Sequence, residues 1–159
     1  MSRRGPARLQ VVAVGAVKPP FAAPVREFEA RVNRLVGLSV DEVRPEPLQR
    51  GGVAVRVVEA GRIRARVSRD AHAVALDPAA SAPRSSDAFA AWLGDHLDRG
   101  RRVAFLIGGA TGIDQALADE CAERMGLGPL TMPHQLARLV LTEQLYRALT
   151  IIHGHPYAH

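Results

Sequence analysis

Short apolar segments alternate along this chain with longer segments of helical periodicity. Most of these segments are continuous runs rich in valine, leucine and isoleucine that stop at glycine or aspartate, which predicts buried strands, whereas residues 38–43 alternate between apolar and polar side chains before Pro45 and predict a strand on that ground. The predicted strands cover residues 9–14, 38–43, 71–76 and 102–107. Strands that alternate with helices predict an α/β domain with a mostly parallel sheet and helices on both faces. We expect one domain that spans residues 1–159.

Five segments carry apolar residues at the spacing of an amphipathic helix. They lie between Pro24 and Gly37, over residues 53–67, between Ser86 as N-cap and Gly100, over residues 113–125 and over residues 134–152. The segment 53–67 also suits a strand, but we favour a helix there because the neighbouring segments are better strands. The segment 126–130 is expected to be a linker or a short strand. The last helix has a wider apolar face than the core of a monomer needs.

The chain carries a formal net charge of +5, and its isoelectric point is about 10.6. Such a surface suits a polyanionic partner, because it attracts phosphates and binding releases counterions. Every basic residue except Lys18 is an arginine, a side chain that binds phosphate through paired hydrogen bonds. A GC-rich genome would also produce an arginine excess, so the net charge is the better evidence for a nucleic-acid partner.

The single cysteine, Cys121, excludes a disulfide within the chain and fits a reducing cytoplasm, where we expect the protein to act. Its place on an apolar helical face suits the core better than a nucleophile. No apolar run reaches the length of a membrane span. Residues 9–17 are short and contain a glycine, so we interpret them as a first strand and not as a signal peptide.

Three predicted strands end in residues that suit ligand binding, at 76–78, 107–109 and 130–133. In an open α/β sheet, ligands bind beyond the carboxyl ends of the strands. The pair Gly108-Gly109 would let a ligand approach the backbone closely, although a tight turn would need glycines as well. The segment 108–112 is neither the dinucleotide fingerprint nor a P-loop, which argues against a usual NAD or ATP site.

Metal binding has to be considered because several histidines lie near the C-terminus. His153, His155 and His159 cluster at the C-terminus, but no cysteine or acidic residue accompanies them at ligand spacing, so we expect no metal. His72 opens a strand and has no partner in the sequence around it. His134 follows a proline at the start of the last helix, where it could cap the helix, pack or face a cleft.

The residues at these strand ends resemble a known family. The resemblance is carried by FLIGGATG at 105–112, TMPHQLAR at 131–138, LTEQLYRA at 141–148 and HPY at 155–157, with support from LQVVAVG at 9–15 and ALD at 75–77. These motifs are similar to those of the RlmH family of ribosomal RNA methyltransferases, which belongs to the knotted SPOUT superfamily. The similarity is specific from about residue 105 to residue 157 and weak between residues 16 and 69.

The resemblance implies methylation of N3 of a pseudouridine in 23S ribosomal RNA, with S-adenosylmethionine as methyl donor and no metal. It also implies a deep trefoil knot near the C-terminus and a homodimer in which the partner completes each site. The implied cofactor-binding residues are Leu76, Gly108, Leu127, Gly128, Pro129, Leu130, Thr131 and Met132. A dimer would explain the wide apolar face of the last helix.

Four residues are candidates for the reaction itself. Arg147, Arg138 and His134 could favour the anionic form of the base, and Tyr157 could position the base or accept its proton. The family carries a histidine directly after this tyrosine, whereas here the role would pass to His159.

Two alternatives stay open. The first is a methyltransferase of the same superfamily that acts on another RNA, and the second is a catalytically silent knotted dimer that binds RNA. Glu143 and Arg147 are four residues apart, so a helix-surface ion pair competes with a functional role for Arg147.

Overall fold

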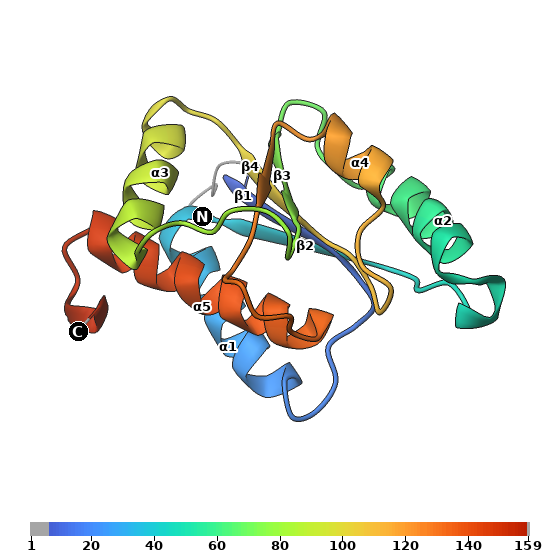
Figure 1. Ribbon diagram of the computed structural model, residues 1–159. Helices are drawn as coiled ribbons and strands as arrows, with labels where there is room; N and C mark the ends of the chain where they lie inside the picture. The colour runs from blue at the N-terminus through green and yellow to red at the C-terminus, as the bar shows by residue number, and fades with distance from the viewer. Residues whose placement is uncertain (1–6, 159) are drawn as a thin grey trace, which may run out of the picture.

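The computed structural model describes residues 7–158, which form five strands, five α-helices and two short 3-10 helices (Figure 1). In chain order they are β1 Leu9–Val14, α1 Ala22–Val36, β2 Leu38–Val43, η1 Leu48–Arg50, α2 Gly52–Arg64, β3 His72–Leu76, α3 Ser86–Asp98, β4 Val103–Ile107, α4 Gln115–Glu120, β5 Glu123–Met125, α5 His134–Ile152 and η2 Pro156–Ala158. None of these helices is long and apolar enough to cross a membrane.

The strands form one parallel sheet in the order β2-β1-β4-β3-β5. The first residues of four strands lie level with one another, because Leu9 pairs with both Leu38 and Val103, and Val103 pairs with His72. The carboxyl ends of these strands therefore meet at one edge of the sheet. This confirms the predicted parallel α/β architecture.

Helices cover both faces of the sheet, with α1, α3 and α5 on one side and α2 and α4 on the other (Figure 1). Alternate residues of β1 point to opposite faces, so Val11 packs in the core beneath α3 and α5, whereas Val12 packs in the core beneath α2 and α4. Both side chains are fully buried. The interior strand β1 thus contributes to two apolar cores, which is why its sequence is a continuous apolar run.

The predictions for β1, β2 and α5 are confirmed to the residue, and α2 is indeed a helix. The single helix expected over residues 113–125 is wrong. The carboxylate of Asp114 accepts a hydrogen bond from the N–H of Leu117 and begins α4, but α4 ends at Glu120 because Cys121 is extended. The next residues pair with β3 as the edge strand β5. Pairing with a strand distant in sequence overrides the local helical pattern.

Of two smaller expectations, one changes and one is confirmed. The N-cap of α3 is Ser85 and not Ser86, since the Ser85 hydroxyl oxygen accepts a hydrogen bond from the N–H of Ala88 at 3.0 Å. The segment 126–130 contains no strand and is a linker, as one of the two interpretations expected.

After β5 the chain crosses from the face of α4 to the face of α5. It passes directly against the loop that follows β3, because the N–H of Gly126 donates to the carbonyl of Ser81 at 3.1 Å. A Cβ atom on Gly126 would lie 2.3 Å from the carbonyl oxygen of Ala80, so only glycine allows this approach. Figure 1 shows the loop after β3 crossing the descending segment that leads into α5.

Replacing Gly126 with alanine tests this contact. The added methyl group would press against backbone, which cannot rotate away, so we expect Gly126→Ala to lower the free energy of unfolding by about 1–3 kcal/mol. Gly61→Ala is the matched control, because nothing lies within 4 Å of its added carbon in α2. We expect that control to stabilise the protein by about 0.5–1 kcal/mol. Denaturant unfolding measures both, and equal stability of the two variants would contradict the close crossing.

Candidate functional site

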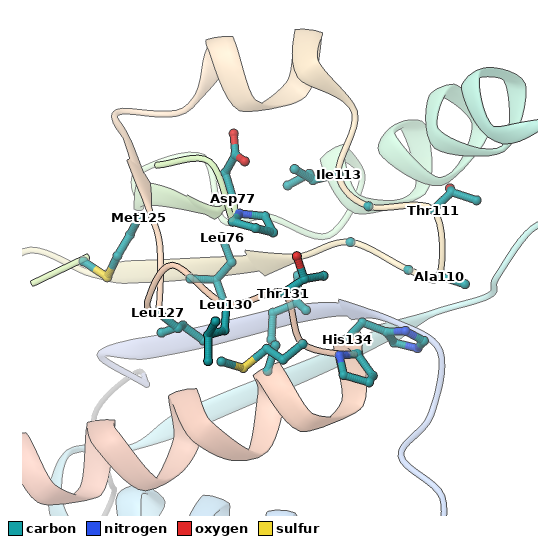
Figure 2. Close-up of a pocket in the computed structure, with 18 of the residues that line it drawn as sticks. Leu76, Asp77, Ala110, Thr111, Ile113, Met125, Leu127, Leu130, Thr131 and His134 are labelled. Atoms are coloured by element: carbon teal, nitrogen blue, oxygen red, sulfur yellow. The ribbon is translucent and has the colours of Figure 1, made fainter. Parts of the chain in front are cut away.

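A pocket of about 630 Å³ opens at the carboxyl edge of the sheet (Figure 2). Its walls come from residues 76–78 after β3, residues 107–113 after β4, the segment that follows β5, and the first turn of α5. The level strand ends and the close crossing at Gly126 bring these segments together. A pocket of this size is typical of sites for small ligands.

The pocket collects most of the residues expected to bind a cofactor. Seven of those eight residues line it, namely Leu76, Gly108, Leu127, Gly128, Leu130, Thr131 and Met132. Pro129 is not among the lining residues. Ile113 and Ala137 also line the pocket, although the sequence analysis gave neither of them a role in ligand binding. Their proximity to a strand end was the signal that could have identified them.

The walls combine apolar side chains with exposed backbone, as Figure 2 shows for Leu76, Ile113 and Leu127. Asp77 adds little net charge, because its carboxylate accepts hydrogen bonds from the guanidinium of Arg124 at 3.1 Å and from the N–H of Ala79 at 2.9 Å. Such walls favour a ligand with a flat apolar group and hydrogen-bonding edges.

The two glycines of the β4 loop serve the backbone of that loop. A Cβ atom on Gly108 would lie 2.5 Å from the carbonyl carbon of Gly112, and one on Gly109 would lie 2.9 Å from Val14. The N–H of Gly112 also donates to the carbonyl of Gly109 at 3.0 Å. Of the two roles that the sequence offered for Gly108 and Gly109, these contacts show the tight turn, and both residues also line the pocket. They allow the loop to fold tightly, and the folded loop then forms one wall.

A buried carboxyl group supports this loop from behind. Glu59 of α2 is only 3% exposed, and one of its oxygens accepts a hydrogen bond from the N–H of Glu46. Its other oxygen, Oε1, has no hydrogen-bond partner within residues 7–158. Burial raises the pKa of Glu59 above its ordinary value. Sequence reasoning missed this residue, because a glutamate on an ambiguous segment gives no local sign of burial.

The four candidate catalytic residues are not together in one chain. His134 lines the pocket at the start of α5, and its burial lowers its pKa below the ordinary value. Arg138 lies elsewhere, with its side chain only 4% exposed, where it donates to Glu29 at 2.7 and 2.9 Å and to Glu42 at 2.6 Å. A buried guanidinium held by two carboxylates joins α5 to α1 and β2. Within one chain Arg138 therefore has a structural role, and its contact with the base stays a prediction.

Arg147 and Tyr157 form a second group near the C-terminus. Both contact Glu143, whose carboxylate lies 2.7 Å from Arg147 Nη2 and 3.1 Å from the Tyr157 hydroxyl. The guanidinium also stacks over the tyrosine ring, 5.2 Å from its centroid. The predicted ion pair between Glu143 and Arg147 is confirmed. Arg147 follows His134 by thirteen positions, which is about 20 Å along a helix.

The tyrosine is a poor proton acceptor at neutral pH. Burial raises the pKa of Tyr157, and its hydrogen bond to Glu143 raises it further, so the hydroxyl stays protonated. Of the two roles expected for Tyr157, positioning by a hydrogen bond is the one that this environment supports. His159 lies outside the described residues.

Comparison with known proteins assigns the family. A family model described as "Predicted SPOUT methyltransferase" matches residues 7–159. The chain belongs to this SPOUT methyltransferase family. A protein of Gemmatimonas aurantiaca named "Ribosomal RNA large subunit methyltransferase H" is 43% identical over 86% of this chain and 89% of its own length. A protein of Sorangium cellulosum with the same name is 42% identical over 96% of this chain and 99% of its own.

A solved structure agrees on the fold. The crystal structure of a probable methyltransferase from Bordetella pertussis superposes with a TM-score of 0.54 at 16% identity, and the match covers 90% of this chain and 95% of that chain. SPOUT methyltransferases use S-adenosylmethionine as methyl donor. The pocket at the carboxyl edge has the size and the apolar, backbone-lined walls that suit this molecule.

The pKa of His134 can be measured directly. Because burial lowers it, we expect an NMR titration of the His134 ring to have its midpoint below 6.5. The unfolded chain then binds more protons than the folded chain between this midpoint and pH 6.5. The contribution of His134 to stability is therefore complete above pH 6.5 and is lost as the pH falls through this window. A midpoint at or above 6.5 would contradict the buried environment.

Proposed function

We propose that the protein transfers the methyl group of S-adenosylmethionine to N3 of a pseudouridine in 23S ribosomal RNA. The observation that carries the proposal is that seven of the eight residues expected from the family motifs line one pocket. The names of the similar proteins specify methylation of large-subunit ribosomal RNA. The net charge of +5 suits an RNA partner.

The cofactor would lie in the pocket against the backbone of the β4 loop and of residues 127–132. Backbone N–H and carbonyl groups would bind the edge of the adenine, and Leu76 and Leu127 would enclose its faces. Bound in this way, the cofactor supplies a methyl group on a positively charged sulfur. The sulfur leaves as a neutral thioether, so the reaction as proposed needs no metal.

The crossing near Gly126 supports the trefoil knot that the family resemblance implies. In a knot of this kind, the segment after β5 would thread through the loop after β3. Such threading requires close contact between the two backbones. The hydrogen bond between Gly126 and Ser81 is one such contact, and the space at Gly126 is too small even for a methyl group. The threaded segment would then be the one that binds the cofactor, which couples the knot to the pocket.

The distance between the pocket and Arg147 supports a homodimer. About 20 Å of helix separates His134 from Arg147 within one chain, so one chain alone does not bring both to the same base. Every residue of 134–151 is buried or half-buried, and the half-buried apolar residues Leu136 and Val140 lie one turn apart on α5. A second copy packed against this part of α5 would bring its own Arg147 and Tyr157 towards the first pocket.

The chemistry requires N3 to lose a proton before it attacks the methyl carbon. The guanidinium of Arg147 would stabilise the resulting anion, since its pKa is raised by the hydrogen bond to Glu143 and it stays charged. Neutral His134 would accept a hydrogen bond or the proton itself. The Tyr157 hydroxyl would fix the plane of the base, so that the nitrogen lies in line with the methyl group.

A variant that fills the pocket tests cofactor binding. Ala137 lines the pocket from α5, so Ala137→Leu places a larger side chain in the space of the ligand while keeping a good helix former. We expect calorimetric titration with S-adenosylmethionine to show an affinity at least about tenfold lower than that of the wild type. Ala54→Leu on the exposed face of α2 is the control and should bind normally. If the wild type does not bind S-adenosylmethionine, both hypotheses of a methyltransferase, on 23S ribosomal RNA or on another RNA, are wrong. The catalytically silent RNA-binding dimer would then remain.

A mixed dimer tests whether Arg147 acts in the partner's site. We expect Arg147→Ala to lower turnover much more than cofactor affinity, and Ala137→Leu to lower both. If each pocket uses the Arg147 of its partner, a dimer with one chain of each kind has one intact site. Its activity should then return to about half of the wild-type value. If each chain used its own Arg147, both sites would keep a lesion. The rate of methyl transfer to ribosomes by the mixed dimer distinguishes these two arrangements. If the mixed dimer recovers no activity, Arg147 does not act in the partner's site.

A further inference from the structure

Three potential metal ligands meet at the end of the sheet opposite the pocket. His72 begins β3, Glu123 begins β5 and His96 lies in the last turn of α3. Glu123 Oε2 lies 2.5 Å from His72 Nε2 and 3.7 Å from His96 Nε2. These three ligand atoms all lie within 4.8 Å of one another, and they form the only such group found among residues 7–158.

The local sequence could not reveal this group. The three residues are separated by more than twenty positions from one to the next, and they meet only because β5 pairs with β3 while α3 packs beside them. The expectation of no metal rested on the tail histidines and on the methyl-transfer reaction. Neither argument concerns this end of the sheet.

The geometry is close to that of a tetrahedral zinc centre. Zinc bonds to histidine nitrogen and carboxylate oxygen at about 2.0–2.2 Å, which places neighbouring ligand atoms about 3.3 Å apart. The two separations from Glu123 Oε2, 2.5 and 3.7 Å, bracket this value, and all three ligand atoms lie within 4.8 Å of one another, so side-chain adjustments would bring them to zinc distances. The carboxylate is 37% exposed, which leaves a side open to water as fourth ligand.

Hydrogen bonds from neighbouring side chains reach both the carboxylate and one of the histidines. The indole N–H of Trp92 donates to both oxygens of Glu123 at 3.2 Å, an outer contact of the kind that orients metal ligands. On the other side, Arg101 Nη1 lies 3.3 Å from His96 Nδ1. A metal on Nε2 would require a proton on Nδ1, so this guanidinium must turn away. Arg101 is exposed and can do so.

We propose that His72, His96 and Glu123 form a structural site for a divalent transition metal of the zinc type. Two imidazoles and one carboxylate are a ligand set that zinc accepts. The metal would join the edge strand β5, which has three residues and pairs only with β3, to β3 and α3. It would thereby hold the strand from which the pocket segment departs. The site is about 13 Å of strand away from the methyl-transfer pocket, so its role is separate from the reaction.

The only tryptophan of the chain provides a local reporter. Trp92 contacts Glu123, and its ring lies 4.7 Å from the His96 ring, so its fluorescence reports on this site. We expect zinc added to metal-free, full-length protein to change this fluorescence with a saturable ratio of one ion per chain. Calorimetry should give the same ratio. At a concentration a hundredfold above its dissociation constant, zinc should raise the melting temperature by about 5–10 °C.

Variants then decide whether these ligands are responsible. His72→Ala and Glu123→Gln should each weaken zinc binding at least about tenfold, since even outer-shell changes cost that much. The matched control is the double variant His153→Ala and His155→Ala, which removes a histidine pair with rings 6.1 Å apart at the tail. It should retain the full response of Trp92. Circular dichroism verifies that each variant is folded, and cobalt in place of zinc should produce the visible absorption of a tetrahedral site.

The opposite results would overturn the proposal. If zinc leaves the tryptophan fluorescence and the melting temperature of the wild type unchanged, the three side chains form a hydrogen-bonded cluster without metal. If binding survives in His72→Ala and Glu123→Gln but disappears in the tail variant, the metal site belongs to His153 and His155.

Discussion

The close passage of the segment after β5 against the loop after β3 is the contact on which the functional end of the molecule depends. At this crossing Gly126 approaches the backbone of residues 80–81 so closely that no side chain fits. The crossing delivers residues 127–134 to the same edge as the glycine loop of β4. A parallel sheet alone would align the strand ends, but the crossing is what closes them into a pocket.

Much of the architecture could be predicted from local patterns. The buried strands β1 and β4 are continuous apolar runs, and α5 has clear helical periodicity with a proline before it. The prediction failed where long-range contacts decide the structure. Residues 123–125 form a strand only because β3 lies beside them. The predicted strand ends at 76–78, 107–109 and 130–133 already named about half of the residues that line the pocket, and the family resemblance added Leu127 and Gly128.

Side-chain environments were harder to predict than backbone positions, because burial and partners come from distant elements. Arg138 belongs to a motif near the pocket, yet its charge is neutralised by Glu29 and Glu42 from other elements. His72 had no neighbour in sequence, yet it meets Glu123 across the sheet. Within one chain, the pocket and the Arg147 group lie at different parts of α5. This separation is the physical reason for proposing that two chains share each site.

The central claim is that this pocket serves methylation of a pseudouridine in 23S ribosomal RNA. Mass spectrometry of 23S RNA from a strain that lacks the gene, with and without the wild-type gene supplied again, tests it most directly. The account predicts that the N3-methyl mark is missing without the gene and returns with it. A methyl mark that persists in the strain without the gene would contradict the claim.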